Sequence, residues 1–133
     1  MIHLYDNYHY NPPAPVLPII IRIPDDSIKQ LTIDALVDTG ADITCLPRAF
    51  ISTLRAERAS TYDIFAINGV LIGRSDSYFL EFELAGMKEL VEVIAIGDEP
   101  ILGRNLINEF TIQLYGPKQK LEIKSRTKKS HAE

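Results

Sequence analysis

The stretch Ala35-Leu36-Val37-Asp38-Thr39-Gly40-Ala41-Asp42 places an acidic side chain where an apolar strand runs into a glycine-containing turn. An Asp at a tight turn often hydrogen-bonds to its own backbone, so a turn alone would account for Asp38 and Gly40. It does not account for the three apolar residues before Asp38, because turns that only connect strands are usually flanked by polar residues. Desolvation at such a position raises the cost of ionising a carboxylate. We therefore interpret Asp38 as a residue that carries chemistry.

Length and composition indicate one globular domain. The chain has 133 residues, of which 46% are hydrophobic and 24% charged, enough for one core and in the ordinary range for globular proteins. Its longest apolar run, residues 16–21, is interrupted by Pro18 and is too short for a membrane span. The N-terminus also lacks the pattern of a secretory signal. We expect no membrane association.

The chain contains a single cysteine, Cys45, so no intrachain disulfide can form. A reducing compartment is the simplest expectation, and we predict a cytoplasmic protein. Cys45 lies in an apolar segment, which favours a small buried thiol over a nucleophile. His3 and His9 have neither a nearby Cys nor helical spacing, so we expect no metal site and no cofactor.

Short β-rich segments alternate with turn signals along most of the chain, which predicts an all-β barrel or sandwich. Asn68-Gly69, set between apolar residues, is a strong hairpin signal, and the turn signal at residues 24–26 ends the first long strand. We expect strands at residues 16–23, 31–37, 78–84, 89–96, 111–115 and 120–123, a helical turn at 48–51, and one short helix at 106–110.

We expect three segments. Residues 1–15 form an extended leader rich in Tyr and Pro, which we expect to hang from the domain rather than fold over it; residues 16–124 form the domain. The basic tail, residues 125–133, has almost no apolar residue, which predicts disorder. From residue 118 onward the net charge is +4, against −8 for the rest of the chain. Such a tail could touch nucleic acid, but nothing in the domain favours that function, and we expect no nucleic-acid partner.

A second motif, Ile101-Leu102-Gly103-Arg104-Asn105-Leu106, follows about sixty residues after Asp38. Together the two motifs resemble those of retropepsin-like aspartic proteases, the single-domain homodimeric group that includes the retroviral proteases. The resemblance covers residues 16–123. It implies a retropepsin-like acid-protease barrel with a flap hairpin and one short C-terminal helix, assembled as a homodimer.

The resemblance also implies roles for individual residues. Asp38, Thr39 and Gly40 match the catalytic triplet, in which Thr39 braces the two loops across the dimer and Gly40 lines the substrate backbone. Ala41 and Asp42 match positions that contact bound peptide. Arg104 matches an arginine that forms a salt bridge with the aspartate at position 42, a role that suits a planar guanidinium. The remaining implied positions are substrate contacts at the flap tip (Ile67, Asn68, Gly69 and Val70) and structural support at Gly103 and Asn105.

The triplet occurs once, whereas the chemistry needs two carboxylates, so two chains must meet to form one site. The expected function is an aspartic endopeptidase that acts on polypeptides with a water nucleophile. The alternative is a catalytically idle peptide-binding or dimerisation module of the same fold. A dimer that binds extended peptides without cutting them would favour that alternative.

Overall fold

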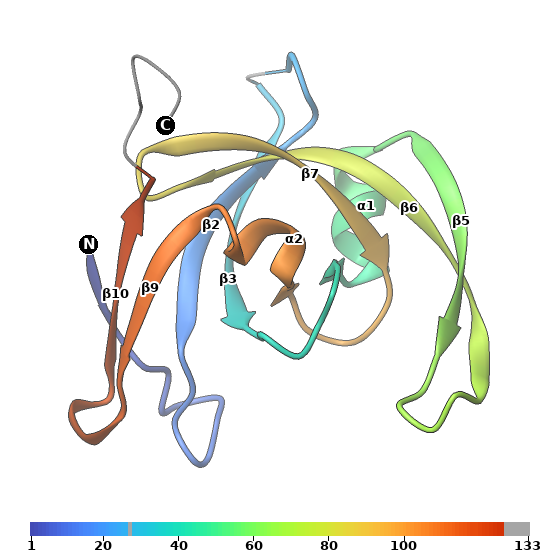
Figure 1. Ribbon diagram of the computed structural model, residues 1–133. Coiled ribbons are helices and arrows are strands. Elements are labelled where there is room, and N and C mark those ends of the chain that lie inside the picture. Colours follow the sequence, from blue (N-terminus) through green and yellow to red (C-terminus); the bar gives the residue numbers. More distant parts are fainter. Residues whose placement is uncertain (27, 127–133) are drawn as a thin grey trace, which may run out of the picture.

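A computed structural model describes residues 1–26 and 28–126, and two β-sheets account for most of them (Figure 1). The all-β prediction is confirmed. The strands are β1 (Ile2–Leu4), β2 (Val16–Arg22), β3 (Gln30–Val37), β4 (Thr44–Leu46), β5 (Arg58–Phe65), β6 (Leu71–Leu84), β7 (Met87–Ala95), β8 (Ile101–Leu102), β9 (Phe110–Tyr115) and β10 (Lys120–Ser125). The helices are α1 (Arg48–Leu54), α2 (Arg104–Ile107) and the short 3₁₀ turn η1 (Gly116–Lys118).

The larger sheet has seven strands in the order β2-β3-β8-β4-β7-β6-β5. Strand β2 also pairs with β6, which closes part of this sheet on itself. Alternating side chains of β6 point inward, so that Leu80, Phe82 and Leu84 are buried while Glu81 and Glu83 face outward. Leu17 and Leu102 are also buried in this core, which fixes the strand ends that carry the motif residues.

The strands β1, β4 and β8 were not predicted, and two predicted elements differ clearly in their bounds. The C-terminal helix spans Arg104–Ile107, earlier than the predicted 106–110, and Phe110 already belongs to β9. Strand β6 begins at Leu71, not at residue 78. The prediction missed this first part because it contains the polar residues Ser75 and Ser77, which are buried in the structure. The Ser75 hydroxyl donates to the Ala95 carbonyl at 2.8 Å, and the Ser77 hydroxyl donates to Glu92 Oε2 at 2.7 Å. Both buried hydroxyls thus have hydrogen-bond partners, which allows polar residues in a buried part of the strand.

The leader is part of the fold, and the expectation that it hangs free is wrong. Strand β1 pairs antiparallel with β10 in the three-stranded sheet β1-β10-β9, seen on the left of Figure 1. Further along, Asp6 bridges to Ala14, and the Tyr10 hydroxyl donates to Glu99 at 2.7 Å. The predicted disordered tail lies, from residue 127 onward, outside the described residues. No helix in the described ranges is long and apolar enough to span a membrane.

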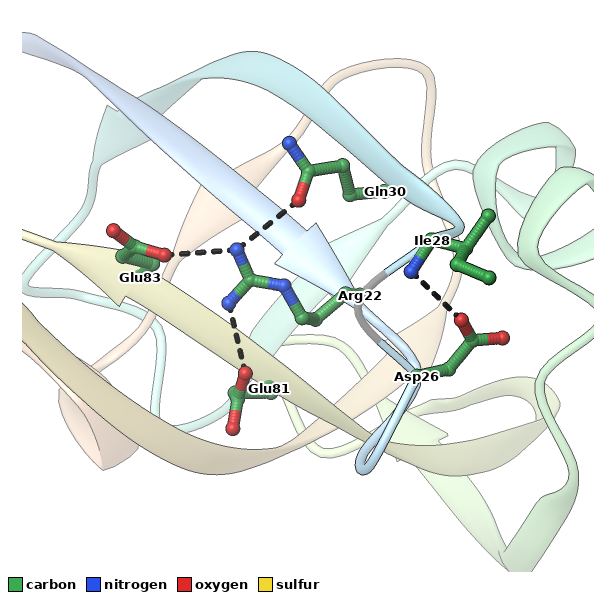
Figure 2. Close-up of polar contacts among 6 residues, drawn as sticks. All are labelled: Arg22, Asp26, Ile28, Gln30, Glu81 and Glu83. Atoms are coloured by element: carbon green, nitrogen blue, oxygen red, sulfur yellow. Dashed lines mark hydrogen bonds and ion pairs between the residues drawn. The ribbon is translucent and has the colours of Figure 1, made fainter.

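One buried cation joins strands β2, β3 and β6 at the outer face of the sheet. The Arg22 guanidinium donates to Glu81 Oε1 and to Glu83 Oε1, both at 2.8 Å, and to Gln30 Oε1 at 3.2 Å (Figure 2). Beyond β2, the Asp26 carboxylate accepts the Ile28 amide and closes the predicted turn before β3. The hydrogen bond from Arg22 is the largest cause of a lowered pKa at Glu83. The contact between Arg22 and Glu83 therefore stabilises the fold fully only while Glu83 is ionised.

We predict that Arg22→Met lowers the urea midpoint at neutral pH and that the difference from the parent shrinks in acid. Glu83 has a folded-state pKa below its ordinary value of 4.5, so its contribution is present above that value and is lost as the pH falls through the lowered pKa. Urea titrations across this pH range measure the effect. Arg58→Met, which removes an exposed 3.9 Å ion pair with Asp76, is the matched control and should change little. A pH-independent difference for Arg22→Met would contradict this account.

Candidate active site

Asp38 lies directly after β3, on a turn that its own carboxylate helps to form. Asp38 Oδ1 accepts the Gly40 amide at 2.9 Å, and the Ala41 amide donates to the Asp38 carbonyl at 3.2 Å. The Asp38 amide in turn donates to the Leu102 carbonyl in β8 at 3.1 Å. The carboxylate is half-buried in the single chain, and its Oδ2 accepts no hydrogen bond from the described residues. The turn thus fixes one oxygen of Asp38 and leaves the other available.

Thr39 and Gly40 form the exposed crest of this turn. The Thr39 hydroxyl has no hydrogen-bond partner among the described residues. A β-carbon at Gly40 would lie 3.1 Å from Asp38 Oδ1, so even a small side chain would crowd the carboxylate. The triplet therefore presents its functional groups outward and not into the core of its own chain.

Beneath the turn, the buried Thr44 connects the two sequence motifs. Its hydroxyl donates to Asn105 Oδ1 at 2.9 Å and accepts the Gly103 amide at 3.0 Å. The Thr44 amide also donates to Asn105 Oδ1, and the Asn105 side-chain amide donates to the Glu92 carbonyl at 2.8 Å. Because Thr44 is 0% exposed, a loss of Asn105 would leave the buried Thr44 amide without this acceptor and the Thr44 hydroxyl with one partner fewer.

Gly103 is required at its position by contact with backbone. A β-carbon there would lie 2.4 Å from the Ile43 carbonyl carbon and 2.6 Å from its oxygen. Only glycine lets β8 and the segment before β4 approach this closely. The predicted support roles of Gly103 and Asn105 thus acquire a geometric basis.

Arg104 supports the turn by a different contact from the expected one. No ion pair joins it to Asp42 within 4 Å in the described part of the chain; instead, Arg104 Nη1 donates to the Thr39 carbonyl at 2.7 Å. The Arg104 amide donates to the Ala41 carbonyl at 2.8 Å. A backbone carbonyl replaces the expected carboxylate because the start of α2 lies against the inner side of the turn, while Asp42 is exposed. The Arg104 guanidinium still connects α2 to the turn that carries Asp38.

The predicted hairpin is present between β5 and β6. The Ala66 amide donates to the Val70 carbonyl at 2.8 Å, and Gly69 adopts a positive φ of 84° at the tip. Apolar side chains are exposed here: Ile67 is fully exposed, and Phe65 and Val70 are 60% and 58% exposed. Neighbouring apolar side chains exposed in this way are typical of surfaces that contact a ligand or a partner.

A cleft of about 540 Å³ lies between the turn and the hairpin. The turn contributes Ala41, Asp42 and Ile43, and the hairpin contributes residues 62–65. The structure thus brings Ala41 and Asp42 together with the base of the hairpin, whereas the tip residues 67–70 and Asp38 lie outside the lining. Ile64 and Phe65 belong to the hairpin segment that the Asn68-Gly69 signal indicated. Thr44 and the lining residues Tyr62, Asp63 and Glu92 were not predicted as part of the site, and no motif in the sequence points to them.

Cys45 also lines this cleft and is half-buried. Desolvation, with smaller effects from the carboxylates of Asp42 and Asp38, raises the pKa of its thiol. A raised pKa keeps the group as a thiol near neutral pH, which disfavours a nucleophilic role.

We predict that Gly103→Ala destabilises the fold by about 1–3 kcal/mol, because the added methyl must displace backbone. Gly116→Ala is the matched control, since a β-carbon there meets nothing within 4 Å. Urea unfolding monitored by circular dichroism measures both variants. Equal midpoints for the two variants would show that the close approach at Gly103 is not constrained.

Solved structures with a similar fold include several aspartic proteases. A retropepsin-like aspartic protease from Rickettsia conorii gives a TM-score of 0.61 with 14% identity, over 96% of this chain and 92% of that one. The EIAV protease in complex with the inhibitor HBY-793 gives 0.51 with 23% identity, over 77% and 90%. A foamy viral protease-reverse transcriptase in complex with an RNA/DNA hybrid gives 0.54 with 23% identity over 74% of this chain, which spans only 12% of that protein. At these identities the likeness shows the fold.

A comparison with curated protein sequences found no match. The family model described as "Spumavirus aspartic protease (A9)" matches residues 28–128, most of the chain, including both motifs and the hairpin. The chain therefore belongs to the spumavirus aspartic protease family and is an aspartic endopeptidase with a retropepsin-like fold.

Proposed function

We propose that two copies of this chain form one proteolytic site, in which the two Asp38 carboxylates act as a pair. The observation that carries this proposal is the single Asp-Thr-Gly triplet, exposed on its turn with one Asp38 oxygen free of hydrogen bonds from the described residues. Two carboxyl groups held close together cannot both ionise, because their negative charges repel, so the two Asp38 side chains share one proton.

The shared proton allows acid and base chemistry in one step. The ionised carboxylate removes a proton from a water molecule, whose oxygen attacks the peptide carbonyl carbon. The protonated carboxylate meanwhile donates a hydrogen bond to the carbonyl oxygen. Collapse of the tetrahedral intermediate breaks the C–N bond, and the amine leaves with a proton from the pair. This reaction requires neither a metal nor a cofactor.

The neighbouring residues position the pair and the substrate. The Thr39 hydroxyl braces the two turns by bonding across the dimer, which accounts for its exposure and its lack of a partner within the described part of one chain. Gly40, without a side chain, lets the substrate backbone approach Asp38. Ala41 and Asp42, which line the cleft, contact the bound peptide.

The β5–β6 hairpin serves as the flap over this site. An extended polypeptide binds beneath it by strand-like hydrogen bonding. The exposed apolar tip, with Ile67 and Val70 on either side of Asn68 and Gly69, closes over the substrate and excludes bulk water.

The sheet β1-β10-β9 offers apolar surface for dimerisation. Ile2 and Leu4 on strand β1 point to one face of this sheet and are 59% and 77% exposed, and neighbouring exposed apolar side chains support a protein partner. We place the core of the protease domain at residues 16–124, to which the leader adds strand β1. We place its site of action in the cytoplasm, where the free Cys45 stays reduced.

We predict that Asp38→Asn lowers peptide cleavage by about a thousandfold or more while the thermal unfolding midpoint stays near that of the parent. The matched control is Asp34→Asn, an exposed position on the same strand β3. Cleavage of a denatured-protein mixture, followed by mass spectrometry, measures both variants. Full activity in folded Asp38→Asn would refute the assignment of Asp38.

A mixing experiment tests the shared site. If parent chains are refolded with a threefold excess of Asp38→Asn, random pairing should reduce the activity of the parent chains to about one quarter. A threefold excess of Asp34→Asn, which retains the triplet, should not reduce it. Unchanged activity with Asp38→Asn would mean that one chain holds a complete site. Separately, a folded parent dimer that binds peptides without cutting them would favour the catalytically idle module.

A further inference from the structure

The cleft beside the active-site turn has an unbalanced charge. Its lining includes the carboxylates of Asp42, Asp63 and Glu92 and contains no Lys, Arg or His. The remaining lining side chains are mainly apolar, such as Ile64 and Ile94. The proposed function makes this cleft part of the substrate site, so its charge bears on which substrates it accepts.

The three carboxylates differ in how far neighbouring groups compensate them. Asp63 pairs with Arg74 Nε at 2.8 Å on the exposed side of the hairpin. Asp42 is exposed, where water screens its charge. Glu92 is half-buried and forms no ion pair among the described residues. Of the three, Glu92 therefore exerts the strongest uncompensated attraction on a ligand.

Glu92 is also held in place by the protein. The Tyr62 hydroxyl donates to Glu92 Oε2 at 2.9 Å, and the buried Ser77 hydroxyl donates to the same oxygen at 2.7 Å. The bond to Glu92 is the largest cause of a raised pKa at Tyr62, so this donor keeps its proton. Both hydroxyls bind Oε2, and Oε1 accepts no hydrogen bond from the described residues. Because no buried polar side-chain atom there lacks a partner, Oε1 is accessible to solvent.

We propose that Glu92 is a specificity-determining residue that selects substrates with a lysine or arginine side chain in this cleft. The inference rests on the proposed proteolytic function. An ammonium or guanidinium group would donate to the free Oε1, while its aliphatic stem packs against Ile64 and Ile94. Two neutral donors fix the carboxylate without cancelling its charge, so little ordering is needed when the cation binds.

The first experiment uses the parent protein and a walking series of peptides. One residue at a time of an otherwise apolar substrate is replaced by Lys, Leu or Glu, and kcat/KM is measured at about pH 6, where ordinary carboxylates are ionised. At one position or more, we expect Lys to exceed Leu by about tenfold and Glu to fall below Leu. Added salt should reduce this preference. Equal rates for Lys, Leu and Glu at every position would overturn the proposal, whereas no cleavage of any peptide would count against the proposed function itself.

The second experiment compares Glu92→Gln with Glu89→Gln. Both remove one carboxylate from strand β7, but Glu89 lies outside the cleft lining. Glu92→Gln should lower the Lys-to-Leu ratio of kcat/KM about tenfold, and Glu89→Gln should leave the ratio unchanged. A preserved ratio in Glu92→Gln, or equal losses in both variants, would refute the role of Glu92. If thermal melting shows that Glu92→Gln does not fold, the salt dependence of the parent's Lys preference decides the question.

Discussion

The buried hydroxyl of Thr44 holds the active-site turn in place. It bonds both to the Gly103 amide and to the Asn105 side chain, and so joins the segment just after the Asp38 motif to the second motif, about sixty residues further along the sequence. The close backbone approach at Gly103 and the Arg104 bond to the Thr39 carbonyl depend on the same alignment of α2 against the turn. In the proposed dimer, each Asp38 must meet its counterpart within hydrogen-bond distance, which needs a rigid base, and these buried bonds provide one.

The hairpin on the other side of the cleft, in contrast, has few buried side chains to hold it. All side chains of β5 except Ile64 are exposed, and in Figure 1 the β5–β6 hairpin extends from the side of the molecule away from β1 and β10. Backbone pairing with β6 holds it, with register shifts near Ser60 and Phe65, while little apolar burial fixes it to the core. Segments with few buried contacts open at low free-energy cost. A rigid turn that faces a loosely held hairpin suits the proposed function, in which the hairpin closes over a bound substrate.

The sequence predicted most of this architecture because its strongest signals are local. β-rich segments next to turn signals located β2 and β3, and Asn68-Gly69 located the hairpin tip. What failed depended on tertiary contacts. The polar start of β6 hid a strand whose Ser75 and Ser77 hydroxyls are satisfied only by β7 and its neighbours, and the β1 pairing with β10 joins the two ends of the chain.

The candidate site was predictable in the same uneven way. Asp38, Gly103 and Asn105 belong to recognisable motifs, whereas Thr44 and Glu92 have ordinary sequence surroundings and acquire their roles from the residues that the fold places around them. The predicted contact of Arg104 with Asp42 was wrong for a related reason. The motif locates Arg104 in the sequence, but its hydrogen-bond acceptor depends on how α2 packs against the turn.

The central claim is that this chain holds half of a catalytic site. The most direct measurement is the specific activity of the purified parent protein over a wide range of concentration, with sedimentation velocity on the same samples. The account predicts that activity per chain rises with concentration in step with the dimer fraction. Activity per chain that stays constant while the protein sediments only as a monomer would contradict it.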